Sequence, residues 1–472
     1  MRLGDLAPDL AAHHAGLDVT GVTADSRRVR PGVLFAALRG ARADGATFVP
    51  QAVANGAAAV LTAPDAVVEA NVPVLRDADP RRRLALMAAA LAGPQPATIA
   101  AVTGTAGKTS VAEFTRQIFA HAGHAAVSIG TLGIRGAAEV PGGLTTPDPV
   151  ELAARLAALA GAGVSHVALE ASSHGIDQRR LDGVRLTAAA FTNIGRDHLD
   201  YHASPADYLA AKLRLFEVLQ ADPRRTVVDP EAPGADAVLA RAPGAFTVGP
   251  SGRDLRLVSA ERTAAGARLI VEGRAGRREV MLPLVGTFQV ANALVSAGLA
   301  VVCCVDEATA LAALEGLVGA PGRLELVGRR DGAPVFVDYA HKPEAITAAL
   351  SAVRESTPGR LVAVIGAGGD RDPGKRRLMG EAAACIADVV VVTDDNPRSE
   401  DPAAIRAEVL VGAPDAWEIA DRGEAIRHAV ALLQEGDALV VAGKGHEEGQ
   451  TVGDRVIPFS DRAAVEAALA RR

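Results

Sequence analysis

The amino-acid sequence predicts an α/β protein built from three domains, and three observations lead to this prediction. At 472 residues the chain is too long for one hydrophobic core. Short apolar runs alternate with Ala-rich runs along the chain, which is the pattern of βαβ units. Two stretches rich in Pro and Gly, residues 92–104 and 318–327, interrupt that alternation. We therefore expect domains at residues 1–93, 94–322 and 323–472.

The composition excludes several classes of function. A net charge of −7 and an aromatic content of 3% argue against a nucleic-acid surface or base-stacking platforms. The start, MRLGDLAPDLAAHH, lacks the basic-then-apolar pattern of a signal peptide. The longest apolar runs, such as VVVV at 389–392, are far shorter than the ~20 residues of a membrane span. We expect a cytoplasmic protein without membrane insertion.

The three cysteines lie in apolar runs. Cys303 and Cys304 are adjacent, and Cys385 lies in another such run. We expect buried thiols in a reducing compartment rather than disulfides.

The predicted strands of the second and third domains all end in polar residues. In the second domain these runs are ATIAAVTG (97–104), HVALEAS (166–172) and LTAAAFTNI (186–194). In the third they are PVFVDYAH (334–341), RLVAVIGAGG (360–369), ADVVVVTDD (387–395) and DALVVAGKGH (437–446). Because parallel sheets bind ligands at the carboxyl ends of their strands, both domains should carry a site at that edge.

The stretch AVTGTAGKTSVAEF (101–114) reads as a strand, a Gly-rich turn and a helix start. Backbone N–H groups at such a helix start cradle phosphate, Lys108 would neutralise it, and the Thr109 hydroxyl would bind Mg²⁺. The spacing departs from G-x-x-x-x-G-K-[ST], because position 102 is Val and the first glycine is Gly104. The alternative is a tight glycine turn with an incidental lysine. We favour a nucleoside triphosphate site.

Lysine is scarce in this chain. Of 49 Lys and Arg residues only five are lysines, namely Lys108, Lys212, Lys342, Lys375 and Lys444. Codon bias alone explains the excess of arginine, but a lysine here suggests a position where a primary amine is wanted.

Two further strand ends are rich in metal ligands. LEASSHGIDQRR (169–180) carries Glu170 and His174, and FTNIGRDHLDYH (191–202) carries Asp197, His198, Asp200 and His202 with Asn193. These groups could hold Mg²⁺ shared with phosphate, form a metal hydrolase site, or simply cap helices. PADYLAAKLRLFEVL (205–219) then predicts an amphipathic helix, on which Lys212 would ordinarily be an exposed surface residue.

Together these motifs resemble the Mur ligase family of ATP-dependent amide-forming enzymes. The order TGTAGKTS, EASSHG, TNIGRDHLDYH, AAK, GTFQVANAL, PGRLE, VDYAHKPE, GAGGDRDPGKR and GKGHE matches from near residue 20 to near 460. Among family members the chain is most similar to the ligase that adds the third stem-peptide residue to UDP-N-acetylmuramoyl-L-alanyl-D-glutamate. The resemblance implies a UDP-binding α/β domain, a P-loop ATPase-like parallel-sheet domain and a Rossmann-like domain that binds the amino acid.

The resemblance also implies the chemistry, which belongs to peptidoglycan precursor synthesis. ATP phosphorylates the substrate carboxylate, and the incoming amine attacks the resulting acyl phosphate. The implied catalytic residues are Lys108, Glu170, His198 and Lys212, the last carbamylated, and the Mg²⁺ ligands would be Thr109, Glu170, His198 and carbamylated Lys212. The implied ATP contacts are Gly104, Thr105, Ala106, Gly107, Lys108, Thr109, Ser110, Asn292, Arg323, Asp338 and His341, and a site drawn from two domains implies closure.

The first domain contains TADSRRVRPGVLFAALRG (23–40), which is similar to the uridine-nucleotide domain of that ligase. The implied contacts to the UDP-muramoyl-dipeptide are Ala24, Ser26, Ala41, Arg42, Ala43, Thr145, Thr146, Ser172, Gln178 and Arg180. Without the family, the Thr pair in LTTPDP would equally well be a loop cap.

The loop TDDNPRSEDP (393–402) is the most informative for the amino acid. In this ligase its DNPR motif goes with meso-2,6-diaminopimelate rather than L-lysine, and the implied contacts are Arg371, Asp395, Asn396, Pro397, Arg398, Gly443 and Glu447. Diaminopimelate has one more carboxylate than lysine, and an arginine such as Arg398 binds a carboxylate bidentately. Asp395 or Asn396 could take the neighbouring ammonium, and Glu447 should pair with the distal one. The simpler alternative makes Asp395 a helix cap and Arg398 a solvated side chain.

The sequence departs from the common family pattern at three positions. Ala106 and Gln289 stand where Asn is frequent, and Ala367 replaces a frequent Cys. Gln289 still offers an amide, and Ala367 suggests that no thiol chemistry is needed there. Lys444 should lie beside the ligand or the sheet end and Lys375 near nucleotide phosphate, whereas Lys342 receives no role.

Three other functions remain open at this point. A folylpolyglutamate synthetase would share the ATP-dependent chemistry, but the DSR and DNPR motifs argue against it. A regulatory P-loop NTPase would hydrolyse ATP without a UDP-sugar or an amino acid, and a metal hydrolase would act without ATP. For the ligase we expect a monomer acting on small molecules only.

Overall fold

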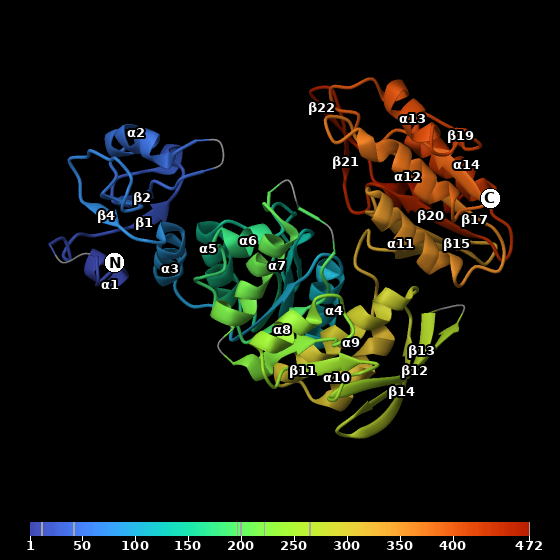
Figure 1. Ribbon diagram of the computed structural model, residues 1–472, viewed down its shortest axis with the longest axis horizontal. Coiled ribbons are helices and arrows are strands. Elements are labelled where there is room, and N and C mark those ends of the chain that lie inside the picture. The colour runs from blue at the N-terminus through green and yellow to red at the C-terminus, as the bar shows by residue number, and fades with distance from the viewer. Residues whose placement is uncertain are drawn as a thin grey trace. The chain divides into compact units, whose positions relative to one another are not determined.

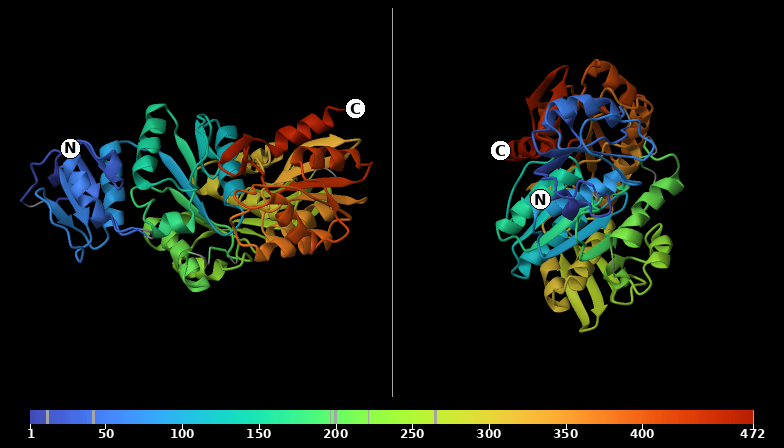
Figure 2. Two further views of the ribbon diagram at one scale, coloured as in Figure 1. Left: turned by 90° about the horizontal axis from the view of Figure 1, so that it is seen from above. Right: turned by 90° about the vertical axis from the view of Figure 1, so that its left-hand side faces the viewer.

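The computed structural model describes the chain except residues 11, 12, 41, 42, 196, 199, 200, 221, 264, 265 and 472. The chain forms two compact units, the first made of residues 1–256 and 295–310, the second of 257–294 and 311–472. Figures 1 and 2 show both units as mixed helices and strands, with α15 at the C-terminal end. No helix in the described residues is long and apolar enough to cross a membrane. The domain limits expected from the sequence stay a prediction.

The N-terminal part of the first unit is a small parallel sheet of order β1-β2-β3-β4 (Figure 1). Leu34 and Leu61 of its strands pack with Leu84 of α3 in a core of their own. The elements are α1 (Leu3–Leu6), β1 (Gly21–Thr23), β2 (Val33–Ala36), α2 (Val49–Ala54), β3 (Ala59–Thr62), β4 (Val74–Arg76) and α3 (Pro80–Ala92), with 3₁₀ turns at Ser26–Arg28 and Gly45–Phe48.

The rest of the first unit surrounds a second, larger sheet. Its parallel strands run in the order β11-β10-β9-β5-β8-β6, and β7 pairs antiparallel with β6. The elements are β5 (Thr98–Thr103), α4 (Lys108–His121), β6 (Ala126–Gly130), β7 (Gly133–Gly136), α5 (Pro149–Gly161), β8 (His166–Glu170), α6 (Ser173–Asp177), β9 (Ala188–Phe191), α7 (Pro205–Arg214), β10 (Thr226–Val228), α8 (Ala235–Arg241) and β11 (Phe246–Gly249). Every residue of β5, β8 and β9 except Thr98 is buried, as the unbroken apolar runs predict.

The next segment passes from the first unit to the second. It contains β12 (Leu255–Thr263), β13 (Gly266–Gly273), β14 (Gly276–Leu282), α9 (Thr287–Val302) and α10 (Glu307–Ala313), with a 3₁₀ turn at Leu314–Gly316. Strands β13 and β14 form an antiparallel hairpin in the second unit, with Gly273 opposite Gly276 at its turn.

The C-terminal part of the second unit is a six-stranded sheet of order β15-β16-β20-β17-β18-β19. The strands β16, β20, β17, β18 and β19 are parallel, and β15 is antiparallel to β16. The elements are β15 (Glu325–Arg330), β16 (Ala333–Asp338), α11 (Pro343–Arg354), β17 (Leu361–Ile365), α12 (Gly374–Ala384), β18 (Val389–Val392), α13 (Pro402–Leu410), β19 (Trp417–Glu418), α14 (Arg422–Ala431), β20 (Ala438–Ala442), β21 (Gly449–Val452), β22 (Arg455–Pro458) and α15 (Asp461–Leu469).

Several helices begin with the same sequence signal. In α3, α5, α7 and α13 the N-cap side chain of Asp79, Asp148, Ser204 or Asp401 accepts a backbone N–H bond, and Pro follows. The cap satisfies an otherwise unpaired N–H group, and Pro has the helical φ angle without needing one. These short signals therefore set where the helices begin.

Two expectations from the sequence are corrected. The helix expected over 205–219 ends at Arg214, and a π-helical turn over Leu215–Leu219 follows, closed by the Gln220 N–H on the Leu215 carbonyl. Only Cys303 is buried, whereas Cys304 and Cys385 are exposed. Cys304 follows α9 with φ 73°, and Cys385 is the C-cap of α12, so each sits where a helix ends rather than on its buried face.

Candidate active site

The Gly-rich loop after β5 has the backbone of a phosphate-binding loop. Gly104 adopts φ 152°, and a Cβ at this position would lie 1.9 Å from Thr192 Oγ1, so only glycine fits. The Ala106 N–H donates to Asn193 Oδ1 at 3.0 Å, which holds the loop against the end of β9. Lys108 is the first residue of α4, and its Nζ donates to the Gly104 and Thr105 carbonyls at 2.9 Å each. The helix start and its lysine are therefore in place for an anionic ligand.

A buried carboxylate lies directly beside this loop. The Thr109 hydroxyl donates to Glu170 Oε2 at 3.1 Å, and the Thr131 N–H donates to Glu170 Oε1 at 2.9 Å. Glu170 ends β8 and is 2% exposed. Gly130 makes room for it, because a Cβ there would lie 2.0 Å from Glu170 Oε1. A hydroxyl and a carboxylate side by side are hard oxygen donors, so the residues present fit Mg²⁺.

Of the four predicted Mg²⁺ ligands, Thr109 and Glu170 are in direct contact. Among the described residues no group of three or more His, Cys, Asp or Glu is placed to hold a metal ion. His198 has φ 53°, lies 3.5 Å from Asp197 through Nε2, and makes an edge contact with His174. Asp200 lies outside the described residues. Thr109 and Glu170 thus form an oxygen pair, His198 makes a ring contact with His174, and the binding of one metal ion by the whole predicted set stays a prediction.

Lys212 is buried rather than on the surface of α7. Its side chain is 1% exposed, and Nζ donates to the Gly104 carbonyl at 2.7 Å, the same oxygen that Lys108 contacts. The Tyr208 ring centroid lies 4.4 Å from Nζ. Burial and, secondarily, the charge of Lys108 hold the pKa of Lys212 well below its ordinary value, although Asp197 opposes them. Lys212 is therefore an amine held towards its neutral form.

The residues predicted for the muramoyl-dipeptide mostly lie together. Thr146 Oγ1 donates to the Glu170 carbonyl and accepts from the Ser172 N–H, and Thr145 Oγ1 is 3.0 Å from Thr131 Oγ1. Arg180 donates to the Thr146 carbonyl at 2.6 Å. Burial lowers the pKa of Arg180, an effect that the charge of Asp148 opposes.

A cavity of about 340 Å³ lies next to these residues. It is lined by Thr23, Ala24, Asp25, Arg28, Leu38, Arg81, Leu84, Asp148, Pro149, Val150, Gln178 and Arg180. Ser26 donates to Gln51 Oε1 at 2.8 Å, and the Ala43 carbonyl accepts from the Gly40 N–H. Ala41 and Arg42 lie outside the described residues. Arg28 and Arg81 also line this cavity, although neither is among the contacts predicted from the sequence.

In the second unit, Asp338 ends β16 and organises the loop before β15. Its carboxylate accepts from the Leu324 N–H at 2.6 Å and from the Ala340 N–H at 2.7 Å. Burial raises the pKa of Asp338, while the charge of Arg323 opposes that rise. Gln289 Nε2 donates to the Arg323 carbonyl, and Asn292 Nδ2 donates to Gln289 Oε1. The predicted nucleotide contacts Asn292, Arg323 and Asp338 thus belong to one connected group.

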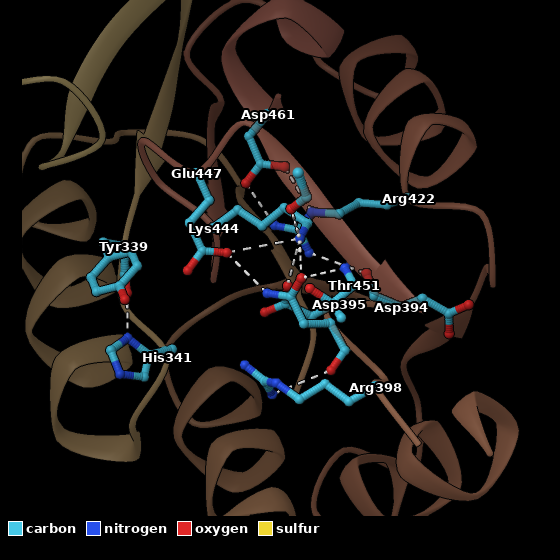
Figure 3. A network of polar contacts seen from close by, with 12 residues as sticks. Tyr339, His341, Asp394, Asp395, Arg398, Arg422, Lys444, Glu447, Thr451 and Asp461 are labelled. Atoms are coloured by element: carbon cyan, nitrogen blue, oxygen red, sulfur yellow. Dashed lines mark hydrogen bonds and ion pairs between the residues drawn. The ribbon is translucent and has the colours of Figure 1, made fainter. Parts of the chain in front are cut away.

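Aromatic and imidazole rings extend this group. His341 Nδ1 is 2.8 Å from the Tyr339 carbonyl, and the rings of Tyr339 and His341 meet with centroids 4.6 Å apart (Figure 3). Arg323 lies over the Tyr339 ring at 4.8 Å. Burial lowers the pKa of His341 and lowers that of His446 to about 4. Lys375 donates to the His341 carbonyl at 3.1 Å.

The loop after β18 meets the loops after β17 and β20 (Figure 3). Arg398 adopts φ 52°, and its Nη1 donates to the Gly369 carbonyl at 2.6 Å. Among the described residues its Nη2 contacts no acceptor. Asp401, not Asp395, caps α13, so the helix-cap alternative for Asp395 is wrong. Gly443 has φ 126°, and a Cβ there would lie 3.1 Å from Asp395 Oδ2.

Charges at this edge are buried in pairs. Lys444 Nζ lies 3.0 Å from Asp395 Oδ1, in ion-pair rather than hydrogen-bonding geometry. Asn396 Nδ2 donates to Glu447 Oε2 at 2.9 Å. Both polar atoms of Asn396 are engaged within the protein, so Asn396 orients its neighbours. Arg371, by contrast, is exposed on the loop after β17.

A fully buried ion pair lies behind this loop cluster. Arg422 donates to both oxygens of Asp461 at 2.7 Å and to the Ala442 carbonyl at 3.0 Å. Burial opposes the charge of Arg422, but the carboxylate of Asp461 outweighs it and raises the arginine pKa. Sequence reasoning missed this pair, because no motif joins residues 39 positions apart.

Comparison with known proteins agrees along the whole chain. Three family models match, described as the Mur ligase family catalytic domain (residues 18–91), the Mur ligase middle domain (102–300) and the Mur ligase glutamate ligase domain (322–445). The chain is 55% identical to the UDP-N-acetylmuramoyl-L-alanyl-D-glutamate–2,6-diaminopimelate ligase of Agrobacterium fabrum, covering 98% of this chain and 95% of that protein. It is 53% identical to the ligase of the same name from Caulobacter vibrioides, covering 96% and 95%.

Solved structures show the same architecture. A structure of a UDP-N-acetylmuramoyl-L-alanyl-D-glutamate–2,6-diaminopimelate ligase matches with a TM-score of 0.76 and 31% identity over 99% of this chain and 98% of that one. The MurF ligase of Thermotoga maritima matches with a TM-score of 0.61 at 20% identity, over 96% and 97% of the two chains, and so shows the fold alone. On its three domain models and its full-length relatives, the chain belongs to the Mur ligase family.

Proposed function

We propose that this chain is the ATP-dependent ligase that adds meso-2,6-diaminopimelate to UDP-N-acetylmuramoyl-L-alanyl-D-glutamate. The observation that carries the proposal is 55% identity, over 98% of the chain, to a ligase named for this reaction. The chain's own residues support it, because a phosphate loop lies in one unit and a loop with oppositely charged side chains in the other. With ATP and a UDP-linked substrate, we place the reaction in the cytoplasm and expect a monomer.

The first chemical step is phosphoryl transfer. The D-glutamyl carboxylate oxygen forms a bond to the γ-phosphorus of ATP, and the bond to ADP breaks. Backbone N–H groups of the loop over residues 104–107 and the Lys108 ammonium offset the phosphate charge as it is redistributed. Mg²⁺ held by Thr109 and Glu170 would add positive charge at the same phosphates. In the second step the amine attacks the acyl carbon, and phosphate leaves.

The neutral character of Lys212 supports its carbamylation. A lone pair on Nζ can form a bond to CO₂, with loss of a proton to solvent, only while the amine is unprotonated. Burial and Lys108 favour that form by lowering the pKa of Lys212. The product is an anionic oxygen ligand beside the Gly104 carbonyl that Lys212 contacts, which a guanidinium could not supply.

Recognition of the amino acid follows from the charges after β17, β18 and β20. Arg398 offers a guanidinium to the distal carboxylate, with Arg371 on the neighbouring loop, and Glu447 offers a carboxylate to the distal ammonium. L-lysine lacks that carboxylate and would leave Arg398 without its partner, which discriminates strongly in a desolvated site. Arg323, Asp338, His341 and Asn292 are assigned to ATP, and Ala24, Ser26, Ala43, Thr145, Thr146, Ser172, Gln178 and Arg180 to the UDP-muramoyl-dipeptide.

The test is ATP-dependent phosphate release with UDP-muramoyl-L-alanyl-D-glutamate and one of meso-diaminopimelate, L-lysine or L-ornithine. We expect turnover with diaminopimelate alone, reduced about 100-fold or more in kcat/KM by Arg398→Ala. Arg377→Ala is the matched control, because Arg377 is an exposed arginine paired with Glu381 on α12.

Each other result contradicts a defined part of the proposal. Equal turnover with lysine would leave the ligase but remove the assignment of the amino acid. Phosphate release that needs neither the UDP-substrate nor an amino acid would favour a P-loop NTPase. Absence of any phosphate release would contradict the ligase itself.

A further inference from the structure

Lys444 is a buried lysine to which the proposed function gives no task. It follows β20 by two residues, is 0% exposed, and lies between Asp395 and Glu447 (Figure 3). Its Nζ is 3.0 Å from Asp395 Oδ1 and 4.0 Å from Glu447 Oε2. It also donates to Asn396 Oδ1 at 3.2 Å and to the Gly449 carbonyl at 3.0 Å. A buried ammonium is tolerated only with such partners.

Lys444 and the backbone N–H of Thr451 together determine which way the Asn396 amide points. The side-chain oxygen and nitrogen of Asn are distinguished by their hydrogen-bond partners. Lys444 Nζ and the Thr451 N–H, at 3.2 and 2.9 Å, are both donors directed at one atom of the amide, so that atom is the oxygen. The NH₂ group must then point to the other side, where it donates to Glu447 Oε2 at 2.9 Å.

Glu447 is thereby held at one oxygen only. Asn396 Nδ2 binds Oε2, and among the described residues Oε1 makes no hydrogen bond. The Asp395 carboxylate lies 3.0 Å from Lys444 and is only 7% exposed, whereas the Glu447 side chain is 35% exposed, so Glu447 is the carboxylate of this cluster that a ligand can reach. We propose that Lys444 is a positioning residue that fixes the Asn396 amide and so aims Glu447 at the distal ammonium of the amino acid. This inference rests on the proposed function.

The same lysine joins three segments of the second unit. It belongs to the loop after β20, contacts Asn396 in the loop after β18, and holds Gly449 at the start of the β21–β22 hairpin. The hairpin returns to the β18 loop through the Arg398 N–H on the Thr451 carbonyl at 3.0 Å. The hairpin, the loop after β18 and the loop after β20 are therefore connected through Lys444 and Asn396, while the Arg398 guanidinium is held separately by the Gly369 carbonyl.

The first test is Lys444→Met, which keeps the length of the side chain and removes its charge and donors. We expect the KM for diaminopimelate to rise roughly 10- to 100-fold, the range for losing a hydrogen bond that involves a charge. The KM values for ATP and the UDP-substrate should stay within about twofold, because neither is assigned to this cluster. The matched control is Arg360→Met, which removes an ion pair with Asp437 at the opposite, amino end of the same sheet.

The second test asks whether Lys444 acts through Glu447. In a Glu447→Gln background, Lys444→Met should raise the KM for diaminopimelate by no more than about twofold further, because the group it positions is already lost. A lysine that only stabilises the fold would instead give effects that multiply. If the single variant fails to fold, Lys444→Met is made together with Asp395→Asn, which avoids leaving a buried carboxylate unpaired, and is compared with Asp395→Asn alone. The same rise in KM is expected between these two variants.

The outcomes separate this inference from the function beneath it. A wild-type chain without phosphate release that depends on diaminopimelate would overturn the proposed function and the inference together. A wild-type chain with that activity, whose Lys444 variants keep its KM for diaminopimelate, would overturn the inference alone. It would also be overturned if the KM effects of Lys444→Met and Glu447→Gln multiplied in the double variant. It would be supported if Lys444→Met raised only the KM for diaminopimelate and added little to the effect of Glu447→Gln.

Discussion

Lys212 in the first unit and Lys444 in the second are both buried beside loops that follow sheet strands, yet their surroundings differ. Among the described residues no carboxylate lies within ion-pair distance of Lys212, whose Nζ meets the Gly104 carbonyl and the Tyr208 ring. Lys444 has Asp395 at 3.0 Å, with further acceptors around it. One lysine is held towards neutrality, and the other lies against a carboxylate.

The difference shows that a buried amine can serve two purposes, which its partners decide. Burial and the charge of Lys108 lower the pKa of Lys212 despite the opposing charge of Asp197, and so favour its neutral amine. Lys444 instead lies 3.0 Å from the Asp395 carboxylate, and its Nζ donates to Asn396 Oδ1. The first arrangement suits covalent modification, and the second suits the positioning of other side chains.

The variant with the largest expected effect tests whether the stability of the second unit depends on burying its charges in pairs. Arg422→Met removes one half of the buried pair with Asp461 and leaves that carboxylate without a counter-charge. We expect the free energy of unfolding to fall by about 3–5 kcal/mol, measured by urea denaturation. Arg377→Met, which breaks an exposed pair with Glu381, should cost less than about 1 kcal/mol. Equal costs for the two variants would mean that buried pairing is not what stabilises this edge.

The variant with the next largest expected effect tests whether the neutral amine of Lys212 is carbamylated. Lys212→Met should lower kcat by about 100- to 1,000-fold, because it removes the carbamate that would help to hold Mg²⁺ at the transferred phosphoryl group. With ¹³C-labelled bicarbonate, a carbamate signal should appear in the wild-type NMR spectrum and vanish in this variant. Lys342→Met, at a lysine without an assigned role, should keep the signal. A wild-type spectrum without a carbamate would contradict the modification.

A smaller effect tests how closely the paired charges of the second unit are packed. Gly443→Ala forces a Cβ to 3.1 Å from Asp395 Oδ2 and 3.4 Å from Arg422 Nη2, at φ 126°. We expect the KM for diaminopimelate to rise about 10-fold, since Asp395 must move. Gly436→Ala is matched in backbone strain, with φ 88°, but its nearest neighbour is 3.6 Å away. If both variants raise the KM alike, strain alone rather than crowding of Asp395 is responsible.

The variant with the smallest expected effect tests whether the first unit also buries a histidine side chain in its neutral form. Burial, with the charge of nearby His124, lowers the pKa of His166 from 6.5 to about 4. In the unfolded chain His166 is protonated as pH falls through 6.5, whereas in the folded chain it is protonated only near pH 4. The free energy of unfolding therefore decreases as pH falls from 6.5 to 4.

The measurement is the melting temperature between pH 7.5 and 5 for wild type and His166→Gln. The variant should lose less stability on acidification, by about 1–2 kcal/mol. His341 and His446, whose pKa values are also lowered, are unchanged in the variant and account for the remaining slope. Identical slopes for both proteins would show that His166 is not buried as a neutral base.

Local patterns predicted much of the fold and part of the site. The apolar runs ending in polar residues became β5, β8, β9, β16, β17, β18 and β20, because strands buried on both faces must be apolar throughout. The loop before Lys108 and its neighbour Thr109 also lie as the Gly-rich motif indicates. Each of these features depends on residues close together in the sequence.

Features that depend on distant residues could not be predicted in this way. The exposure of Cys304 and Cys385 depended on where each helix ended. The pairing of Arg422 with Asp461, and the contact of Thr131 with Glu170, each join residues 39 positions apart. Likewise, the sequence placed an ammonium contact on Asp395 or Asn396, whereas both polar atoms of Asn396 are used inside the protein.

The sequence by itself determined the α/β class, the strands that carry the site and the residue types at their ends, because periodicity, turn residues and helix caps act locally. It also singled out Lys212 and Lys444 as unusual in a chain rich in arginine. Only the tertiary structure decided that Lys212 lacks a carboxylate within ion-pair distance among the described residues while Lys444 has Asp395. Burial and counter-charges come from segments that folding brings together, so the partners of each amine, and with them the task it can perform, depend on the tertiary structure.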